Sequence, residues 1–123
     1  MGLTVLICGD RKWTDRGLLF RILDRLPQTG LRVIEGGATG ADRLAREWTL
    51  SRKAQCIEMA AEWDKYGPQA GPIRNIAMLD LHPDLVVAFH DHIDTSKGTA
   101  HCLREAKARK IPTRLVTHAS LTW

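Results

Sequence analysis

The chain has 123 residues, 44% of them hydrophobic, and its formal net charge is +4 at pH 7. This length suits one domain with a hydrophobic core, and no apolar run approaches the roughly 20 residues that cross a bilayer. We therefore expect a single domain over residues 1–123, with no membrane partner. The N-terminal residues show no signal-peptide pattern, which predicts a cytoplasmic protein. The mild positive charge favours an anionic partner, a nucleotide more than a nucleic acid.

Three cysteines, Cys8, Cys56 and Cys102, lie far apart in the sequence. Their number is odd, and no zinc-type spacing relates them. We expect them to be small core residues in a reducing compartment.

Apolar segments alternate with amphipathic segments along the whole chain. The expected strands are residues 3–8, 31–34, 54–60, 85–89 and 113–117, and the expected helices are 15–26, 41–52, 70–82 and 98–110. Strands that alternate with helices predict an α/β fold, here a five-stranded, mainly parallel sheet with helices on both faces. Ligands of such folds bind outside the carboxyl ends of the strands.

Residues 35–42, Glu-Gly-Gly-Ala-Thr-Gly-Ala-Asp, connect the second expected strand to the second helix. Three glycines within five residues permit positive φ and allow a ligand to approach the backbone. Thr39 is expected to cap the helix, and Asp42 completes a capping-box pattern. The N–H groups of such a turn, together with the helix dipole, can bind an anion. A tight turn built for helix–sheet packing explains the same residues.

Further candidate ligand residues lie in the loops after the first, third and fourth expected strands. A second helix start suited to phosphate lies at residues 97–99, arginine side chains can grip phosphate oxygens, and a tryptophan can stack on a base. The predicted ligand-binding residues are Gly9, Arg11, Gly36, Gly37, Ala38, Thr39, Gly40, Asp42, Trp63, Arg74, Asn75, Lys97, Gly98 and Thr99. Some of these residues also have a purely structural explanation. Arg11 could form a salt bridge, Arg74 and Asn75 could be a pair on a helix surface, and Trp63 could close the edge of the core. Trp48, on an apolar helix face, is expected in the core.

Glu35 and Asp10 are the candidate catalytic residues. Glu35 could orient a ribose hydroxyl or polarise water, or it could be a strand-end charge that faces solvent. His90 and His92, with carboxylates nearby, are the candidate metal ligands. A polar loop is the commoner explanation of that segment, so we predict no metal.

Several of these motifs together resemble a known family. They are Gly9-x-Arg11, residues 36–42, Trp63, residues 70–78 (Ala-Gly-Pro-x-Arg-Asn-x-x-Met) and Gly98-Thr99. They resemble the YspA-type, cpYpsA-related branch of the SLOG superfamily, which groups the Smf/DprA DNA-processing proteins with the LOG-type phosphoribohydrolases. The resemblance covers nearly the whole chain. It implies a Rossmann-like domain that binds nucleotides or their derivatives, often as a dimer.

One position departs from the LOG enzymes, which carry a Pro-Gly-Gly-x-Gly-Thr-x-x-Glu signature. Gly98 and Thr99 match it, whereas Cys102 stands at the place of the glutamate. The resemblance therefore implies nucleotide binding more than cleavage by the LOG route.

We therefore predict a sensor or sequestering protein for a nucleotide signal, by analogy one used in phage–bacterial conflict. A nucleotide hydrolase that cleaves an N-glycosidic or phosphate bond is the first alternative. Single-stranded DNA binding, as in Smf/DprA, is the second. No resident cofactor is firmly implied, and the expected partners are a nucleotide-type small molecule and further copies of the chain in a homo-oligomer.

Overall fold

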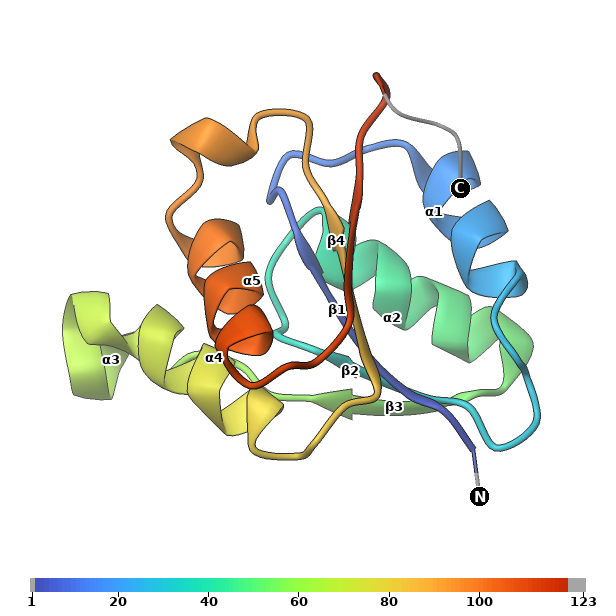
Figure 1. Ribbon diagram of the computed structural model, residues 1–123, viewed down its shortest axis with the longest axis horizontal. Helices are drawn as coiled ribbons and strands as arrows, with labels where there is room; N and C mark the ends of the chain where they lie inside the picture. Colours follow the sequence, from blue (N-terminus) through green and yellow to red (C-terminus); the bar gives the residue numbers. More distant parts are fainter. Residues whose placement is uncertain (1, 120–123) are drawn as a thin grey trace.

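The computed structural model describes residues 2–119, which form a parallel sheet between two layers of helices (Figure 1). The strands are β1 (Thr4–Gly9), β2 (Arg32–Glu35), β3 (Gln55–Glu58), β4 (Leu85–Phe89) and β5 (Thr113–Val116). Their order is β3-β2-β1-β4-β5, and every neighbouring pair is parallel. The predicted α/β fold is confirmed.

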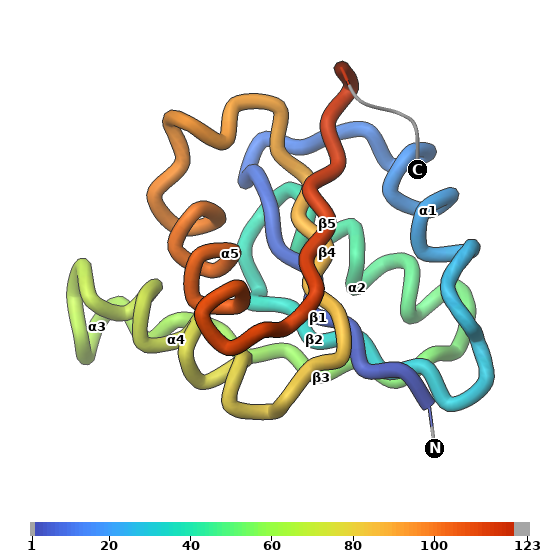
Figure 2. The backbone as a smooth tube through the Cα atoms, viewed as in Figure 1, coloured from blue at the N-terminus to red at the C-terminus, as the bar shows by residue number. Residues whose placement is uncertain are grey.

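Four longer helices cover the sheet. They are α1 (Arg16–Asp24), α2 (Ala41–Arg52), α4 (Ala70–Leu79) and α5 (Gly98–Ala108). Helices α1 and α2 lie on one face, and α4 and α5 on the other (Figures 1 and 2). Three short helices fall in segments expected to be loops: α3 (Trp63–Tyr66), and the 3₁₀ helices η1 (Gly67–Gln69) and η2 (Ile93–Thr95). None of the helices among residues 2–119 is long and apolar enough to span a bilayer.

The central strand β1 contributes to both hydrophobic cores. Successive side chains of a strand point to opposite faces, so Val5 and Ile7 pack with α1 and α2, whereas Leu6 and Cys8 pack with α4 and α5. A strand buried on both faces needs apolar residues at consecutive positions, which explains the apolar run of residues 5–8.

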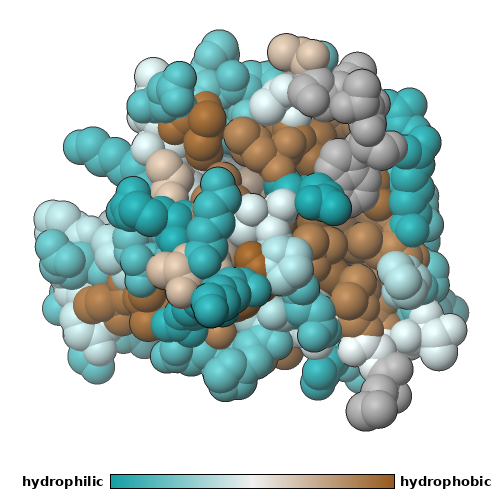
Figure 3. Space-filling view, in the orientation of Figure 1, coloured by the Kyte–Doolittle hydropathy of each residue, from teal (hydrophilic) through white to brown (hydrophobic). Residues whose placement is uncertain are grey.

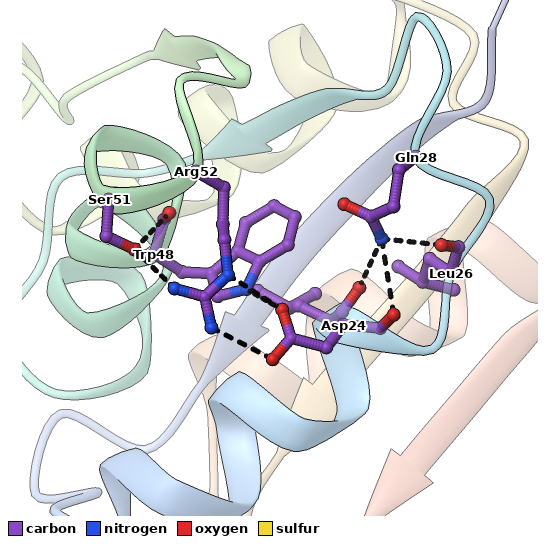
Figure 4. A network of polar contacts seen from close by, with 7 residues as sticks. Asp24, Leu26, Gln28, Trp48, Ser51 and Arg52 are labelled. Atoms are coloured by element: carbon purple, nitrogen blue, oxygen red, sulfur yellow. Dashed lines mark hydrogen bonds and ion pairs between the residues drawn. The ribbon is translucent and has the colours of Figure 1, made fainter.

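Trp48 is completely buried, which confirms the predicted core position. Its indole Nε1 donates a hydrogen bond to Asp24 Oδ1 at 2.9 Å, and Arg52 makes an ion pair with the same carboxylate (Figure 4). The predicted helix start at Asp15 is also correct, because its carboxylate accepts a hydrogen bond from the N–H of Leu18.

The edge strand β3 is shorter than expected and less buried. It pairs only with β2, and the last pair in the register is Glu35 with Glu58. The prediction that Cys56 is a core residue is wrong, because an edge strand leaves this side chain partly exposed. Hydrophobic surface is also visible over the α3–α4 region (Figure 3), where Trp63, Tyr66 and Ile73 are exposed.

The segment after β5 is attached to the loops that follow β1 and β4. The imidazole of His118 lies between two carboxylates, with Nδ1 2.6 Å from Asp91 Oδ2 and Nε2 2.7 Å from Asp15 Oδ2. Its ring stacks on Trp13, with ring centroids 4.7 Å apart. The hydrogen bonds that the His118 ring donates to Asp91 and Asp15 raise the pKa of His118.

Candidate functional site

A cavity of about 630 Å³ lies at the carboxyl edge of the sheet. The chain runs outward from β1 to β3 on one side and from β4 to β5 on the other, so the strand order reverses between β1 and β4. Residues that follow both of these strands line the cavity, which places it at the topological switch point. Its volume falls within the range of small-molecule and cofactor sites.

Twelve of the candidate ligand-binding, catalytic and metal-ligating residues line this cavity. They are Gly9, Asp10, Arg11, Ala38, Asp42, Trp63, Arg74, Asn75, His90, Lys97, Gly98 and Thr99. Glu35, Gly36, Gly37, Thr39, Gly40 and His92 are not among the lining residues. Lys12, Ser96 and His101 also line the cavity and were not predicted, because no motif distinguishes a single lysine, serine or histidine from other surface residues.

Basic residues outnumber acidic residues on the cavity wall. The side chains of Arg11, Lys12, Arg74 and Lys97 line it, together with the carboxylates Asp10 and Asp42. The four basic residues come from three separate segments, which only the folded sheet edge brings together. Four cations around one cavity favour an anionic ligand.

The glycine turn differs from the anion site expected there, because the protein's own carboxylates already bind its N–H groups. Gly36 and Ala38 donate to Asp42 Oδ2 at 3.1 and 3.3 Å, and Gly37 donates to Glu35 Oε1 at 2.6 Å. The predicted Thr39 cap is wrong: the N-cap of α2 is Gly40, without a side-chain hydrogen bond. Asp42 thus acts as an internal anion for the turn instead of completing a capping box.

Internal packing accounts for the glycines of this turn. A Cβ at Gly36 would lie 2.3 Å from Arg74 Nη1, and one at Gly40 would lie 2.2 Å from the carbonyl oxygen of Asp10. Gly37 and Gly40 also have φ of +72° and +75°, which side chains disfavour. The tight-turn alternative therefore describes this segment better than direct contact with a ligand.

Arg74 is held in place by two hydrogen bonds. Its Nη1 donates to the carbonyl oxygen of Gly36 at 2.6 Å, and its Nε donates to Asn75 Oδ1 at 3.0 Å. Nη2 makes no hydrogen bond with any residue in the range 2–119. The guanidinium is therefore oriented by the protein and keeps one nitrogen available to a ligand in the cavity.

Asn75 connects α4 to the start of α5. Its buried amide Nδ2 donates to the carbonyl oxygen of Gly98 at 3.1 Å and lies 3.2 Å from His101 Nδ1. Because the amide nitrogen is a donor, Nδ1 must be the acceptor, and the ring proton is then on Nε2. Asn75 thus organises its neighbours on the cavity wall.

The first turn of α5 is the other helix start that the sequence marks as suited to phosphate. Ser96 Oγ accepts hydrogen bonds from the N–H groups of Thr99 at 3.0 Å and Ala100 at 3.3 Å. No atom lies within 4 Å of a Cβ built on Gly98, so this side of the helix start is open. The Gly98 N–H, the Lys97 side chain and the positive end of the helix dipole are therefore available there.

Two buried carboxylates have raised pKa values. Burial raises the pKa of Asp42 to about 6, although the Ala38 N–H, the Arg74 charge and the Gly36 N–H oppose this shift. Burial raises the pKa of Glu35 to about 8. The hydrogen bond from the Gly37 N–H opposes this shift, and the neighbouring Glu58 adds to it. Glu35 is completely buried, so it is not a charge that faces solvent.

The two candidate metal ligands, His90 and His92, are hydrogen-bonded to each other. His90 lines the cavity, but its Nδ1 accepts a hydrogen bond from the His92 N–H at 2.9 Å. Residues 2–119 contain no group of three or more metal-ligating side chains.

Trp63 lies at the cavity with 47% of its surface exposed, and the Arg11 guanidinium lies 5.5 Å from its ring centroid.

A parallel sheet with a basic cavity at its switch point defines a Rossmann-like α/β protein. The model of the YspA, cpYpsA-related SLOG family matches residues 3–66, and the chain belongs to this family. The chain is also 38% identical over 116 residues to the Gene 61 protein of Mycobacterium phage D29, a match that covers 88% of this chain and 91% of that protein. No solved structure matches the chain. Family membership connects the protein with nucleotide-related binding or processing.

Proposed function

We propose that the protein binds a phosphorylated, nucleotide-derived small molecule in the 630 Å³ cavity, as a sensor or a sequestering protein for a nucleotide signal. The observation that carries this proposal is the convergence of Arg11, Lys12, Arg74 and Lys97 on one nucleotide-sized cavity. The related phage protein supports the narrower proposal of a signal used in phage–bacterial conflict.

The phosphate would bind at the first turn of α5 and not at the glycine turn. The N–H groups of Gly36, Gly37 and Ala38 already bond to carboxylates, whereas the start of α5 combines an open Gly98 with the Lys97 ammonium. The exposed face of Trp63 would accept the base, beside the Arg11 guanidinium.

A nucleotide hydrolase is the second candidate, and one observation favours it. Asp42 lines the cavity with a pKa of about 6, and a carboxyl group perturbed in this way is suited to proton transfer near neutral pH. Cys102, at the place of the LOG-type glutamate, is completely buried and does not line the cavity. Simple binding therefore remains our first choice.

Thermal melts and calorimetric titration with AMP, ADP, ADP-ribose and a cyclic dinucleotide test the binding proposal. A ligand that binds only the folded state raises the melting temperature. Lys97→Ala should weaken binding, whereas Lys107→Ala, in the last turn of the same helix, should not. If none of the four compounds binds, the proposal is wrong.

Two further measurements separate the alternatives. Chromatography after incubation with AMP should recover the intact nucleotide, whereas release of adenine over several turnovers would favour the hydrolase. Affinity for single-stranded DNA that exceeds the affinity for nucleotides, and that falls steeply with salt, would favour the Smf/DprA-like alternative.

A further inference from the structure

One oxygen of Asp42 accepts no hydrogen bond from the part of the chain that the structure describes. Oδ2 accepts the hydrogen bonds of Gly36 and Ala38, but Oδ1 accepts none from residues 2–119. The side chain is only 6% exposed and lines the cavity. Oδ1 is therefore a buried acceptor, without a donor among residues 2–119, on a residue that lines the cavity.

The neighbouring cations do not satisfy this oxygen. Arg74 and Arg11 are close enough to favour the charged form of Asp42, yet neither donates a hydrogen bond to it. Arg74 directs Nη1 and Nε to Gly36 and Asn75 instead. A buried carboxylate oxygen without a donor is costly, so a ligand that supplies a donor gains affinity from this oxygen.

We propose that Asp42 Oδ1 accepts a hydrogen bond from a ribose hydroxyl, and that the cavity therefore selects ribonucleotides over deoxyribonucleotides. This inference rests on the proposed function and specifies the class of its ligand. A sugar phosphate offers both required groups: an anion for Arg74 and the start of α5, and a hydroxyl donor a short distance away. A phosphate without a sugar would leave Oδ1 unsatisfied.

Asp42→Asn tests the inference because the hydrogen bonds of the turn fix the orientation of the new amide. The N–H groups of Gly36 and Ala38 need an oxygen acceptor, so the amide oxygen must face the turn. The amide NH₂ then faces the cavity and presents a donor where the wild type presents an acceptor. The substitution thus replaces one hydrogen-bond acceptor by a donor and keeps the shape of the side chain.

The experiment measures the affinities of AMP, 2′-deoxy-AMP and 3′-deoxy-AMP for the wild type, for Asp42→Asn and for Glu47→Gln by calorimetric titration. Glu47 is an exposed carboxylate on the same helix, paired with Arg16. In the wild type and in Glu47→Gln, at least one deoxy analogue should bind about tenfold or more weakly than AMP, as expected when a hydrogen bond to a charged group is lost. In Asp42→Asn this preference should fall to about threefold or less, because the neutral amide N–H can donate to the hydroxyl oxygen only a weaker hydrogen bond than the carboxylate accepts.

The possible results separate this inference from the function on which it rests. Equal affinities of the wild type for all three nucleotides would overturn the selection of ribose and leave nucleotide binding intact. A tenfold preference that persists in Asp42→Asn would remove Asp42 from that role. Failure of all three to bind would overturn the proposed binding of AMP-type nucleotides and this inference with it.

Discussion

Asp42→Asn should make the protein without ligand more stable at about pH 8. The wild-type carboxylate is ionised at that pH, although it is buried with one oxygen unpartnered. Asparagine keeps an oxygen for the N–H groups of Gly36 and Ala38 and removes the buried charge. A substitution that impairs the site should therefore stabilise the fold, as expected where function requires a costly charge.

The size and pH range of this effect follow from the pKa of Asp42. Folding raises it from the usual 3.8 to about 6. At roughly 1.4 kcal/mol for each pH unit, the ionised form costs about 3 kcal/mol of stability. Because the folded state holds the proton more tightly than the unfolded state, this cost is complete above about pH 6. It shrinks as the pH falls from about 6 toward 3.8 and is absent below that range.

Urea unfolding of the wild type, Asp42→Asn and Glu47→Gln between about pH 4 and pH 8 measures the effect. Asp42→Asn should unfold at higher urea concentration than the wild type at about pH 8, and the difference should vanish at about pH 4. The charge of Asp42 is one cause of the raised pKa of Glu35, so Asp42→Asn also lowers that pKa and adds to the gain in stability at about pH 8, whereas Glu47→Gln leaves both carboxyl groups in place. A stability gain that does not depend on pH, or a loss at about pH 8, would refute the assignment of a strained charge to Asp42.

Three further predictions concern other contacts of the cavity and the C-terminal segment. Arg74→Ala should weaken AMP binding and also cost about 2 kcal/mol of stability, because it removes two hydrogen bonds from a charged donor; urea unfolding and calorimetry measure both. Long-range ¹H–¹⁵N spectra should place the ring proton of His101 on Nε2, and Asn75→Leu should remove this preference. His118→Phe should lower the melting temperature more at about pH 6 than at about pH 9, because a raised histidine pKa stabilises the fold below the unfolded pKa and this contribution is lost as the pH rises through the folded value.

Matched controls accompany each of these predictions. Arg74→Lys keeps the charge but cannot reproduce both hydrogen bonds, so its affinity should lie between those of the wild type and Arg74→Ala. Full wild-type affinity in a folded Arg74→Ala would remove the arginine from the site. A proton on Nδ1 of His101 would contradict the orientation of the Asn75 amide. Phenylalanine can still stack on Trp13, so an equal loss of melting temperature at both pH values would mean that the carboxylates do not stabilise charged His118.

The fold and much of the cavity wall could be predicted from the sequence, because they depend on local patterns. The apolar run in β1 and the helical spacing in α1 are signals that neighbouring residues carry together. The rule that ligands bind at the carboxyl ends of parallel strands then brings Arg11, Arg74 and Lys97 to one edge, where the structure has them around one cavity.

Only the tertiary structure decided which groups are available to a ligand. The sequence of the glycine turn suggests free N–H groups, but hydrogen-bond partners depend on three-dimensional distance, and Asp42 and Glu35 fold back onto the turn. Burial likewise depends on the packing of distant segments, so no local pattern predicts that Glu35 is enclosed or that His101 joins the cavity. The sequence by itself therefore determined where the chain could bind an anion, whereas packing determined which N–H groups, carboxylate oxygens and cations remain unpaired there.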